Sequence, residues 1–154
     1  MDAFSHELND LLTDVFWSIL RIEEQAANRV AGGDLSISEM HMLEAVSKND
    51  EYGRTISELA ADQHITLSSV TIAVNKLMKK GYVEKIRHEE DGRQVFVKLT
   101  KIGRKVNAGH LYFHENMVRN VNQGMSEEEK EVLLKAMKNL NNFFRRKLEP
   151  GDET

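Results

Sequence analysis

Residues 66–79 carry small polar and basic side chains at helical spacing, a combination suited to contacting nucleic acid. Apolar residues recur every three or four positions, which predicts a helix with one buried stripe. The stripe is Leu67, Val70, Val74 and Leu77. The opposite face, with the residue before the helix, holds Thr66, Ser68, Ser69, Thr71, Ile72, Asn75, Lys76 and Lys79. Hydroxyl and amide groups near a helix N-terminus bond phosphates or base edges in the major groove, and lysines contact phosphate. An ordinary polar face capped by serines is the alternative interpretation.

Positive charge is concentrated in and just after this helix. The net formal charge of the chain is -4, but residues 76–105 hold ten Lys and Arg, Arg87 and Arg93 among them, against four acids. This block is therefore +6 and the remainder is -10. Because binding to phosphate depends on local charge, an acidic protein can still dock one basic face on DNA. A solvated helix and hairpin surface would show the same charge pattern.

The elements that must position these residues are marked by capping boxes. Ser36-x-x-Glu39, Thr55-x-x-Glu58 and Ser126-x-x-Glu129 each predict a helix start. Helices are expected at about 4–30, 36–47, 55–63, 67–80, 100–122 and 126–148. Residues 82–87 and 94–99, rich in β-branched and aromatic side chains around a polar turn, predict a hairpin. The fold class is therefore mainly α with one small β-hairpin.

Composition limits the remaining possibilities. A chain of 154 residues with 40% apolar and 30% charged content fits one compact domain, with a flexible tail at 149–154. No apolar run approaches the roughly 20 residues of a membrane-spanning helix, so we expect a cytoplasmic protein without a membrane partner. Zero cysteines exclude disulfides and thiolate metal ligands. No HExxH, GxSxG or Gly-rich phosphate loop is present, and an enzyme is not expected.

Residues 36–103 resemble the winged helix-turn-helix of the MarR family of bacterial regulators. The resemblance rests on Val70-Thr71, Leu77, Lys80-Gly81-Tyr82-Val83, Asp91-Gly92-Arg93 and Leu99-Thr100-x-x-Gly103, and the six-helix order also matches. It implies a homodimer that places recognition helices in successive major grooves of pseudo-palindromic double-stranded DNA and each wing in a flanking minor groove. Arg93 then resembles the wing-tip arginine and Asp91 the carboxylate that orients it. Many relatives carry arginine at the position of Ile72, so their base preference does not transfer.

The two end segments, about 1–35 and 104–148, are expected to form the dimer. Both are amphipathic helices without an obvious partner in the DNA-binding part. Their apolar surface comes from Phe4, Leu8, Leu11, Leu133, Met137, Leu140 and Phe144. Packing within one chain is the alternative for some of these residues. Two-fold symmetry would place half-sites about 10 base pairs apart on the DNA.

A cluster of histidine and glutamate residues suggests an effector site, although no cofactor is expected to be required. Zinc accepts imidazole and carboxylate ligands in four-coordinate sites. If their three helices converge, one such site could be formed by Glu24, His41, His110 and His114. These residues also resemble the ligand set of the zinc-responsive MarR branch. Purely structural roles for the histidines are the simpler interpretation.

A second resemblance points to a different effector. The segments Ile22-Glu23-Glu24, Glu39-Met40-His41, Phe113-His114 and Gly124–Glu129 look most like the branch that represses fatty-acid-synthesis genes in Firmicutes. That branch implies a response to long-chain acyl groups on acyl carrier protein. An acyl pocket would be lined by Trp17, Leu20, Glu24, His41, Met42, Phe113 and Met117. Ordinary core packing of these residues, or a winged helix that binds protein instead of DNA, are the alternatives left open.

Overall fold

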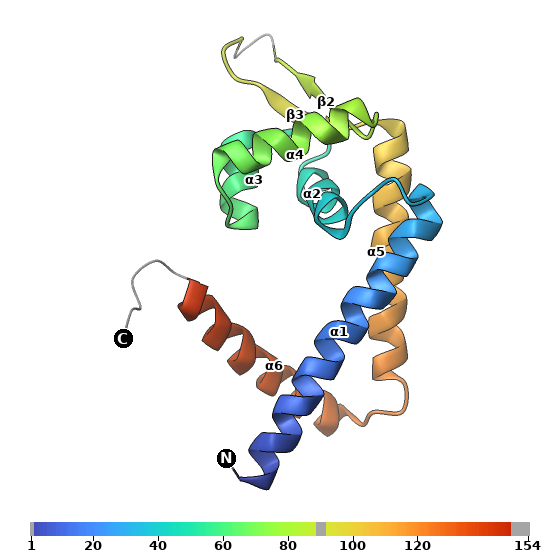
Figure 1. Ribbon diagram of the computed structural model, residues 1–154, viewed down its shortest axis with the longest axis vertical. Helices are drawn as coiled ribbons and strands as arrows, with labels where there is room; N and C mark the ends of the chain where they lie inside the picture. Colours follow the sequence, from blue (N-terminus) through green and yellow to red (C-terminus); the bar gives the residue numbers. More distant parts are fainter. Residues whose placement is uncertain (1, 89–91, 149–154) are drawn as a thin grey trace. The chain divides into compact units, whose positions relative to one another are not determined.

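The computed structural model describes residues 2–88 and 92–148 (Figure 1). These divide into two compact units, one ending at residue 114 and the other beginning at 115, within a continuous helix. The predicted 149–154 tail lies outside the described residues, and the expectation of one domain stays a prediction. The helices are α1 (Ala3–Ala31), α2 (Ile37–Ser47), α3 (Ile56–Gln63), α4 (Leu67–Lys79), α5 (Lys101–Asn122) and α6 (Glu127–Leu148). None of them is long and apolar enough to cross a membrane within the described part of the chain.

All six predicted helices are confirmed, and α2, α3 and α6 start at the three predicted capping boxes. The Ser36 hydroxyl accepts the Glu39 amide proton at 3.2 Å while the Glu39 carboxylate accepts that of Ser36 at 2.9 Å. Thr55 and Glu58 repeat this reciprocal pair at the start of α3. Ser126 and Glu129 repeat it at the start of α6. Each box satisfies two amides that lack partners in the helix, and so fixes the residue at which the helix begins.

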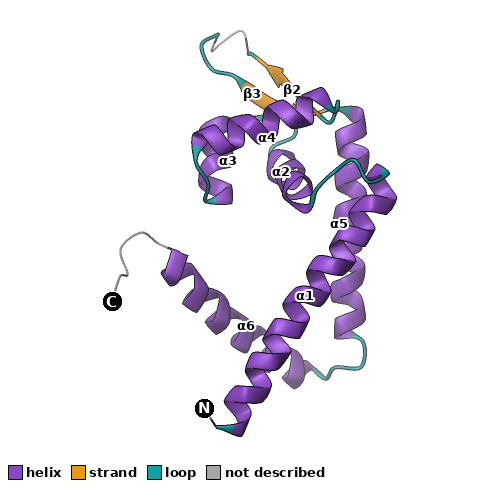
Figure 2. Ribbon diagram, viewed as in Figure 1, coloured by secondary structure: helices purple, strands orange, loops and turns teal. Residues whose placement is uncertain are grey.

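The predicted hairpin is confirmed as part of a three-stranded antiparallel sheet (Figure 2). Strand β3 (Phe96–Leu99) lies between β2 (Val83–Ile86) and β1 (Arg54–Thr55). The register pairs Val83 with Leu99 on one side of β3 and Arg54 with Val97 on the other. Strand β1 was not predicted, because two residues are too few to show alternation of polar and apolar side chains. It ties the hairpin to the segment that leads into α3.

Helix α2 is the centre of the first unit. Its buried side chains lie on nearly all sides, and it contacts α1, α3, α4 and β3. The least exposed large side chains of the core are Met40, Leu43, Leu59, Leu77 and Leu99. Val70, Val74 and Leu77 are fully buried, as predicted for α4. The prediction for Leu67 was wrong, since 55% of this residue is exposed. Leu67 is the first residue of α4 and follows the exposed turn 64–66, so it lies beyond the edge of the core.

The junction between the sheet and α5 explains the Leu99-Thr100-x-x-Gly103 pattern. The Thr100 hydroxyl donates to the Gly81 carbonyl at 2.7 Å and accepts from the Gly103 amide at 3.1 Å. The Thr100 amide donates to the Tyr82 carbonyl at 3.0 Å. A Cβ atom at position 103 would lie 2.0 Å from the Tyr82 carbonyl oxygen. Glycine is therefore required here for close backbone approach, and the wing is joined firmly to the start of α5.

Helices at the two ends of the chain expose apolar side chains. In the first unit, the N-terminal half of α1 exposes Phe4, Leu8, Leu11, Leu12, Val15, Phe16 and Trp17. In the second unit, α6 has no buried residue and exposes Val132, Leu133, Leu134, Met137, Phe143, Phe144 and Leu148. Exposed apolar surface of this extent usually marks an interface with another molecule.

Candidate nucleic-acid interface

A tight turn sets the start of α4. Helix α3 ends at Gln63, and the capping residue His64, with its left-handed φ of 53°, turns the chain sharply. Thr66 then caps α4: its hydroxyl accepts the Ser69 amide at 3.2 Å and lies 2.8 Å from the Ser69 hydroxyl. The N-terminus of α4, with the partial positive charge of its free amides, is thereby held next to an exposed cluster of hydroxyl groups. This arrangement suits contact with a phosphate or a base edge.

Most residues of the predicted outer face of α4 are exposed to solvent on the same side of the helix. Six of the predicted residues on the helix itself are exposed, namely Ser68, Ser69, Ile72, Asn75, Lys76 and Lys79. Thr66 is exposed too. Thr71 is half-buried, and its hydroxyl donates a hydrogen bond to the Leu67 carbonyl at 2.9 Å. Ile72 is 58% exposed, so its side chain is available to a thymine methyl group. The Thr71 hydroxyl is the least available of the predicted contacts.

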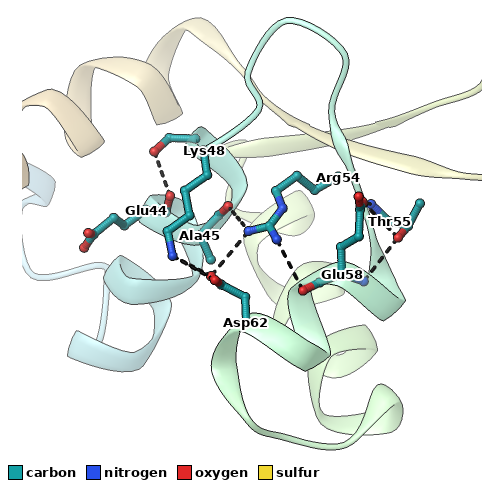
Figure 3. Close-up of polar contacts among 8 residues, drawn as sticks. Glu44, Ala45, Lys48, Arg54, Thr55, Glu58 and Asp62 are labelled. Atoms are coloured by element: carbon teal, nitrogen blue, oxygen red, sulfur yellow. Dashed lines mark hydrogen bonds and ion pairs between the residues drawn. The ribbon is translucent and has the colours of Figure 1, made fainter. Parts of the chain in front are cut away.

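A polar network joins α2, β1 and α3 (Figure 3). The Arg54 guanidinium donates to the Ala45 carbonyl at 2.8 Å and lies 3.3 Å from the Asp62 carboxylate, which Lys48 also contacts at 2.8 Å. Burial opposes ionisation of Asp62, but Lys48 and Arg54 lower the pKa of this carboxyl below its ordinary value. One arginine from β1 thus joins α2 to α3. No pattern in the sequence predicts this contact, because its partners lie on three different elements and include a backbone carbonyl.

The wing is the hairpin of β2, β3 and the loop between them. Arg87 and Arg93, at the two ends of this loop, are both exposed, whereas Asp91 lies outside the described residues. The Lys85 ammonium on β2 donates to the Asn75 side chain on α4 at 2.9 Å. Lys85 was not among the predicted site residues, yet it links the two DNA-facing elements. Because Asn75 already accepts this bond, its amide nitrogen is the group left for a base edge.

The lysines and arginines of the basic block divide into structural and available groups. Lys80 pairs with the Glu39 carboxylate at 2.9 Å, and Arg104 with Asp50 at 3.2 Å. Burial opposes ionisation of Glu39, but the Ser36 amide and Lys80 lower its pKa. Within the described ranges 2–88 and 92–148, no ion pair involves Lys76 or Lys79. Both lysines are therefore available to contact phosphate.

A second cluster of polar side chains lies inside the first unit, between α1, α2 and α5. The buried Glu23 carboxylate lies 2.8 Å from Nε2 of His41 and 3.3 Å from Nε2 of His114. His110, 3% exposed, lies 3.3 Å from the Glu44 carboxylate and 3.1 Å from His114. Burial and the neighbouring His114 lower the pKa of His110, against the opposite influence of Glu23 and Glu44.

The glutamate predicted for this cluster was Glu24, but the residue found there is its neighbour Glu23. Glu23 and Glu44 approach the three histidines, and Glu24 does not: it is exposed and lines a hollow with Trp17 and Leu20. Adjacent residues point about 100° apart around a helix, so only one of two consecutive glutamates can face α2 and α5. The sequence contains no signal for this choice, because the rotation of α1 that buries Glu23 and Ala27 on one face is set by packing.

The residues predicted for an acyl pocket fall in different places. Trp17, Leu20 and Glu24 line an open hollow of about 740 Å³ beside the α1–α2 connection. His41 and Met42 line another, of about 830 Å³, which also includes Ile72 and Lys76 of α4. Phe113 is half-buried on α5, with its ring centroid 5.2 Å from that of His114. Met117 belongs to the second unit. The two hollows adjoin at the start of α2, where both are lined by Ser36, Ser38, Glu39 and Lys80.

Known proteins that are similar to this chain are transcriptional regulators. The family described as transcriptional regulator SarA/Rot matches residues 32–109, half of the chain. The structure of Streptococcus pneumoniae FabT in complex with DNA is similar at 36% identity with a TM-score of 0.82, covering 92% of this chain and 98% of FabT. The Bacillus subtilis transcriptional repressor YetL is 26% identical over 140 residues, 91% of this chain and 82% of YetL.

More distant structures share the fold. A MarR family protein from Bacillus stearothermophilus has a TM-score of 0.67 at 17% identity, covering 94% of this chain and 99% of that protein. The family and the relatives are transcriptional regulators and not enzymes. The DNA-binding function expected from the polar face of α4 and the basic wing is thereby confirmed. The chain belongs to the SarA/Rot-type winged-helix transcriptional regulators, within the MarR-like family that includes FabT.

Proposed function

We propose that this regulator is a homodimeric repressor of fatty-acid-synthesis genes. The observation that carries the proposal is the exposed polar face of α4 beside a basic wing, in a chain 36% identical to FabT over nearly the whole FabT chain. Each protomer inserts α4 into a major groove and its wing into the flanking minor groove. The relative YetL is itself named a repressor. Bound at a promoter, such a dimer blocks access of the transcription machinery.

The homodimer is supported by the apolar surfaces of the end helices. Helix α6 exposes Leu133, Met137 and Phe144 and buries nothing within its own unit. Covering such surface with a second copy removes apolar area from water at about 25 cal/mol per Å². A dimer also joins two weak half-site contacts into one operator contact, with half-sites about 10 base pairs apart.

The effector that we propose is a long-chain acyl group presented by acyl carrier protein. Trp17 and Leu20 offer apolar surface in an open hollow of about 740 Å³. Arg21, at the same hollow, provides a cation that can attract an acidic carrier. The ligand acts by binding more tightly to one of two conformations that differ in the spacing of the DNA-binding elements. A ligand with equal affinity for both conformations would not change their populations.

Zinc is the second candidate effector, and one observation favours it. Ligand atoms around a tetrahedral zinc ion lie about 3.3 Å apart, given metal distances of about 2.0 Å. The separations from Glu23 to His114, His114 to His110 and His110 to Glu44 are 3.3, 3.1 and 3.3 Å. Two overlapping groups of three donors, Glu23 with His41 and His110 and Glu44 with His110 and His114, each lie within 4.8 Å of one another and offer three ligands to one ion, with Glu23 in the place predicted for Glu24. Zinc held there would join α1, α2 and α5.

One titration separates these proposals. The metal-stripped protein is added to promoter DNA from its own gene neighbourhood at fixed salt, alone, with zinc, and with long-chain acyl carrier protein. A change in affinity with acylated carrier, absent with unacylated carrier, supports the lipid effector. A change with zinc that is lost in His110→Gln supports the metal. No binding to any promoter fragment would refute the proposed repressor function.

A further inference from the structure

Three aromatic side chains meet where the wing loop leaves β2. The Tyr52 ring, from the connection between α2 and β1, stacks on His88 with centroids 3.8 Å apart and planes 15° apart. Both rings meet Phe96 of β3 edge-on, at 4.9 and 4.8 Å. Nε2 of His88 also lies 2.8 Å from the Tyr52 carbonyl oxygen. His88 is therefore held by one ring face, one ring edge and one polar contact.

The segment that carries Tyr52 is itself fixed to the sheet. Gly53 follows it with a φ of +92°, and a Cβ atom there would lie 3.0 Å from the side chains of Phe96 and Lys98. Lys98 donates to the Glu51 carbonyl at 2.6 Å, and β1 begins at Arg54. The backbone on both sides of Tyr52 is thus anchored to β3. Tyr52 stacks on the wing from a fixed support, although 43% of the residue is exposed.

We propose that Tyr52 is a positioning residue for DNA binding, which directs the wing through His88. His88 directly follows Arg87, and the loop that it begins leads to Arg93. Holding the His88 ring restrains the described end of the wing next to Arg87, and so reduces the freedom that the wing arginines lose on entering a minor groove. The proposal rests on the proposed contact of the wing with DNA. It assigns a role in DNA binding to a residue outside both α4 and the wing.

The test compares Tyr52→Leu with Tyr52→Phe on two lengths of DNA. Leucine keeps apolar contact with Phe96 but removes the stacked ring, whereas phenylalanine keeps the ring and removes only the hydroxyl. The long duplex is a sequence selected by the unaltered protein and extends beyond both half-sites; the short duplex ends at them and lacks the flanking minor grooves. We expect Tyr52→Leu to bind the long duplex about tenfold more weakly and the short one like the unaltered protein, given the usual strength of an aromatic pair. Tyr52→Phe should match the unaltered protein on both.

A double-mutant cycle provides the second readout. Arg93→Ala removes the wing-tip charge, so adding Tyr52→Leu to it should cost little further affinity. Equal losses by Tyr52→Leu on both duplexes, additive losses with Arg93→Ala, or no loss at all would each overturn the proposal. His88→Leu tests the same stack from the other side if Tyr52→Leu lowers the thermal midpoint. Failure of the selection to yield any duplex that the unaltered protein binds would instead refute the proposed function.

Discussion

Replacing Lys76 by glutamine should reduce the salt dependence of DNA binding by a defined amount. Lys76 is exposed on the outer face of α4 and takes part in no ion pair among residues 2–88 and 92–148. Its charge is therefore compensated by phosphate when DNA binds. Each phosphate contact adds about -0.9 to the slope of log K against log salt concentration. Two copies in a dimer would contribute about -1.8.

This slope converts directly into a measurable ratio. Between about 50 and 200 mM salt, a fourfold change, a slope difference of about 1.8 corresponds to a factor of about 12. The affinity advantage of the unaltered protein over Lys76→Gln should therefore shrink about 12-fold across that range. Fluorescence anisotropy with a labelled operator duplex at several salt concentrations measures it.

Lys130→Gln is the matched control, because Lys130 lies on α6, in the second unit, and pairs with Glu127 at 2.7 Å. It removes the same charge and should leave the slope unchanged. An unchanged slope in Lys76→Gln, or an equal change in Lys130→Gln, would refute the assignment of the α4 face to phosphate.

Acid should destabilise the fold through His110. The pKa of His110 is lower in the folded chain than in the unfolded chain, so the unfolded chain binds the proton at a higher pH. The free energy of unfolding should therefore fall as the pH drops below 6.5. Urea denaturation at pH 7.5 and 5.5 checks this, and an equally steep fall in His110→Gln would contradict it. Gly103→Ala should cost about 1–3 kcal/mol, because its Cβ would lie 2.0 Å from the Tyr82 carbonyl. Gly92→Ala adds a Cβ that meets no atom of the described residues within 4 Å, and it should change the thermal midpoint little. Met137→Asp should convert the dimer to a monomer in analytical ultracentrifugation; a stable dimer would show that α6 lies outside the interface.

Local chemistry made the elements predictable from the sequence. The capping boxes at Ser36, Thr55 and Ser126 satisfy helix amides within four residues, so the helix starts need no tertiary information. The spacing of Val70, Val74 and Leu77 indicated the buried face of α4, and thereby the exposed residues opposite. Periodicity does not show where the core ends, which is why Leu67 was misplaced.

Contacts between distant segments were not predictable in the same way. The choice between Glu23 and Glu24 depends on how α1 is rotated against α2 and α5, a rotation fixed by packing at Ala27. The stack of Tyr52 on His88 joins residues 36 positions apart through a two-residue strand that carries no pattern. Such contacts arise from sheet pairing and packing, and they appear only once the fold is known.

Selection of duplexes from a random-sequence library tests the central claim most directly, because it assumes no operator. The unaltered protein is incubated with the library at moderate salt, and bound duplexes are recovered and sequenced. The account predicts an enriched pseudo-palindrome whose half-sites are centred about 10 base pairs apart, one for each α4 of a dimer. Bound DNA without any enriched sequence, or with a single half-site and no symmetric partner, would contradict it.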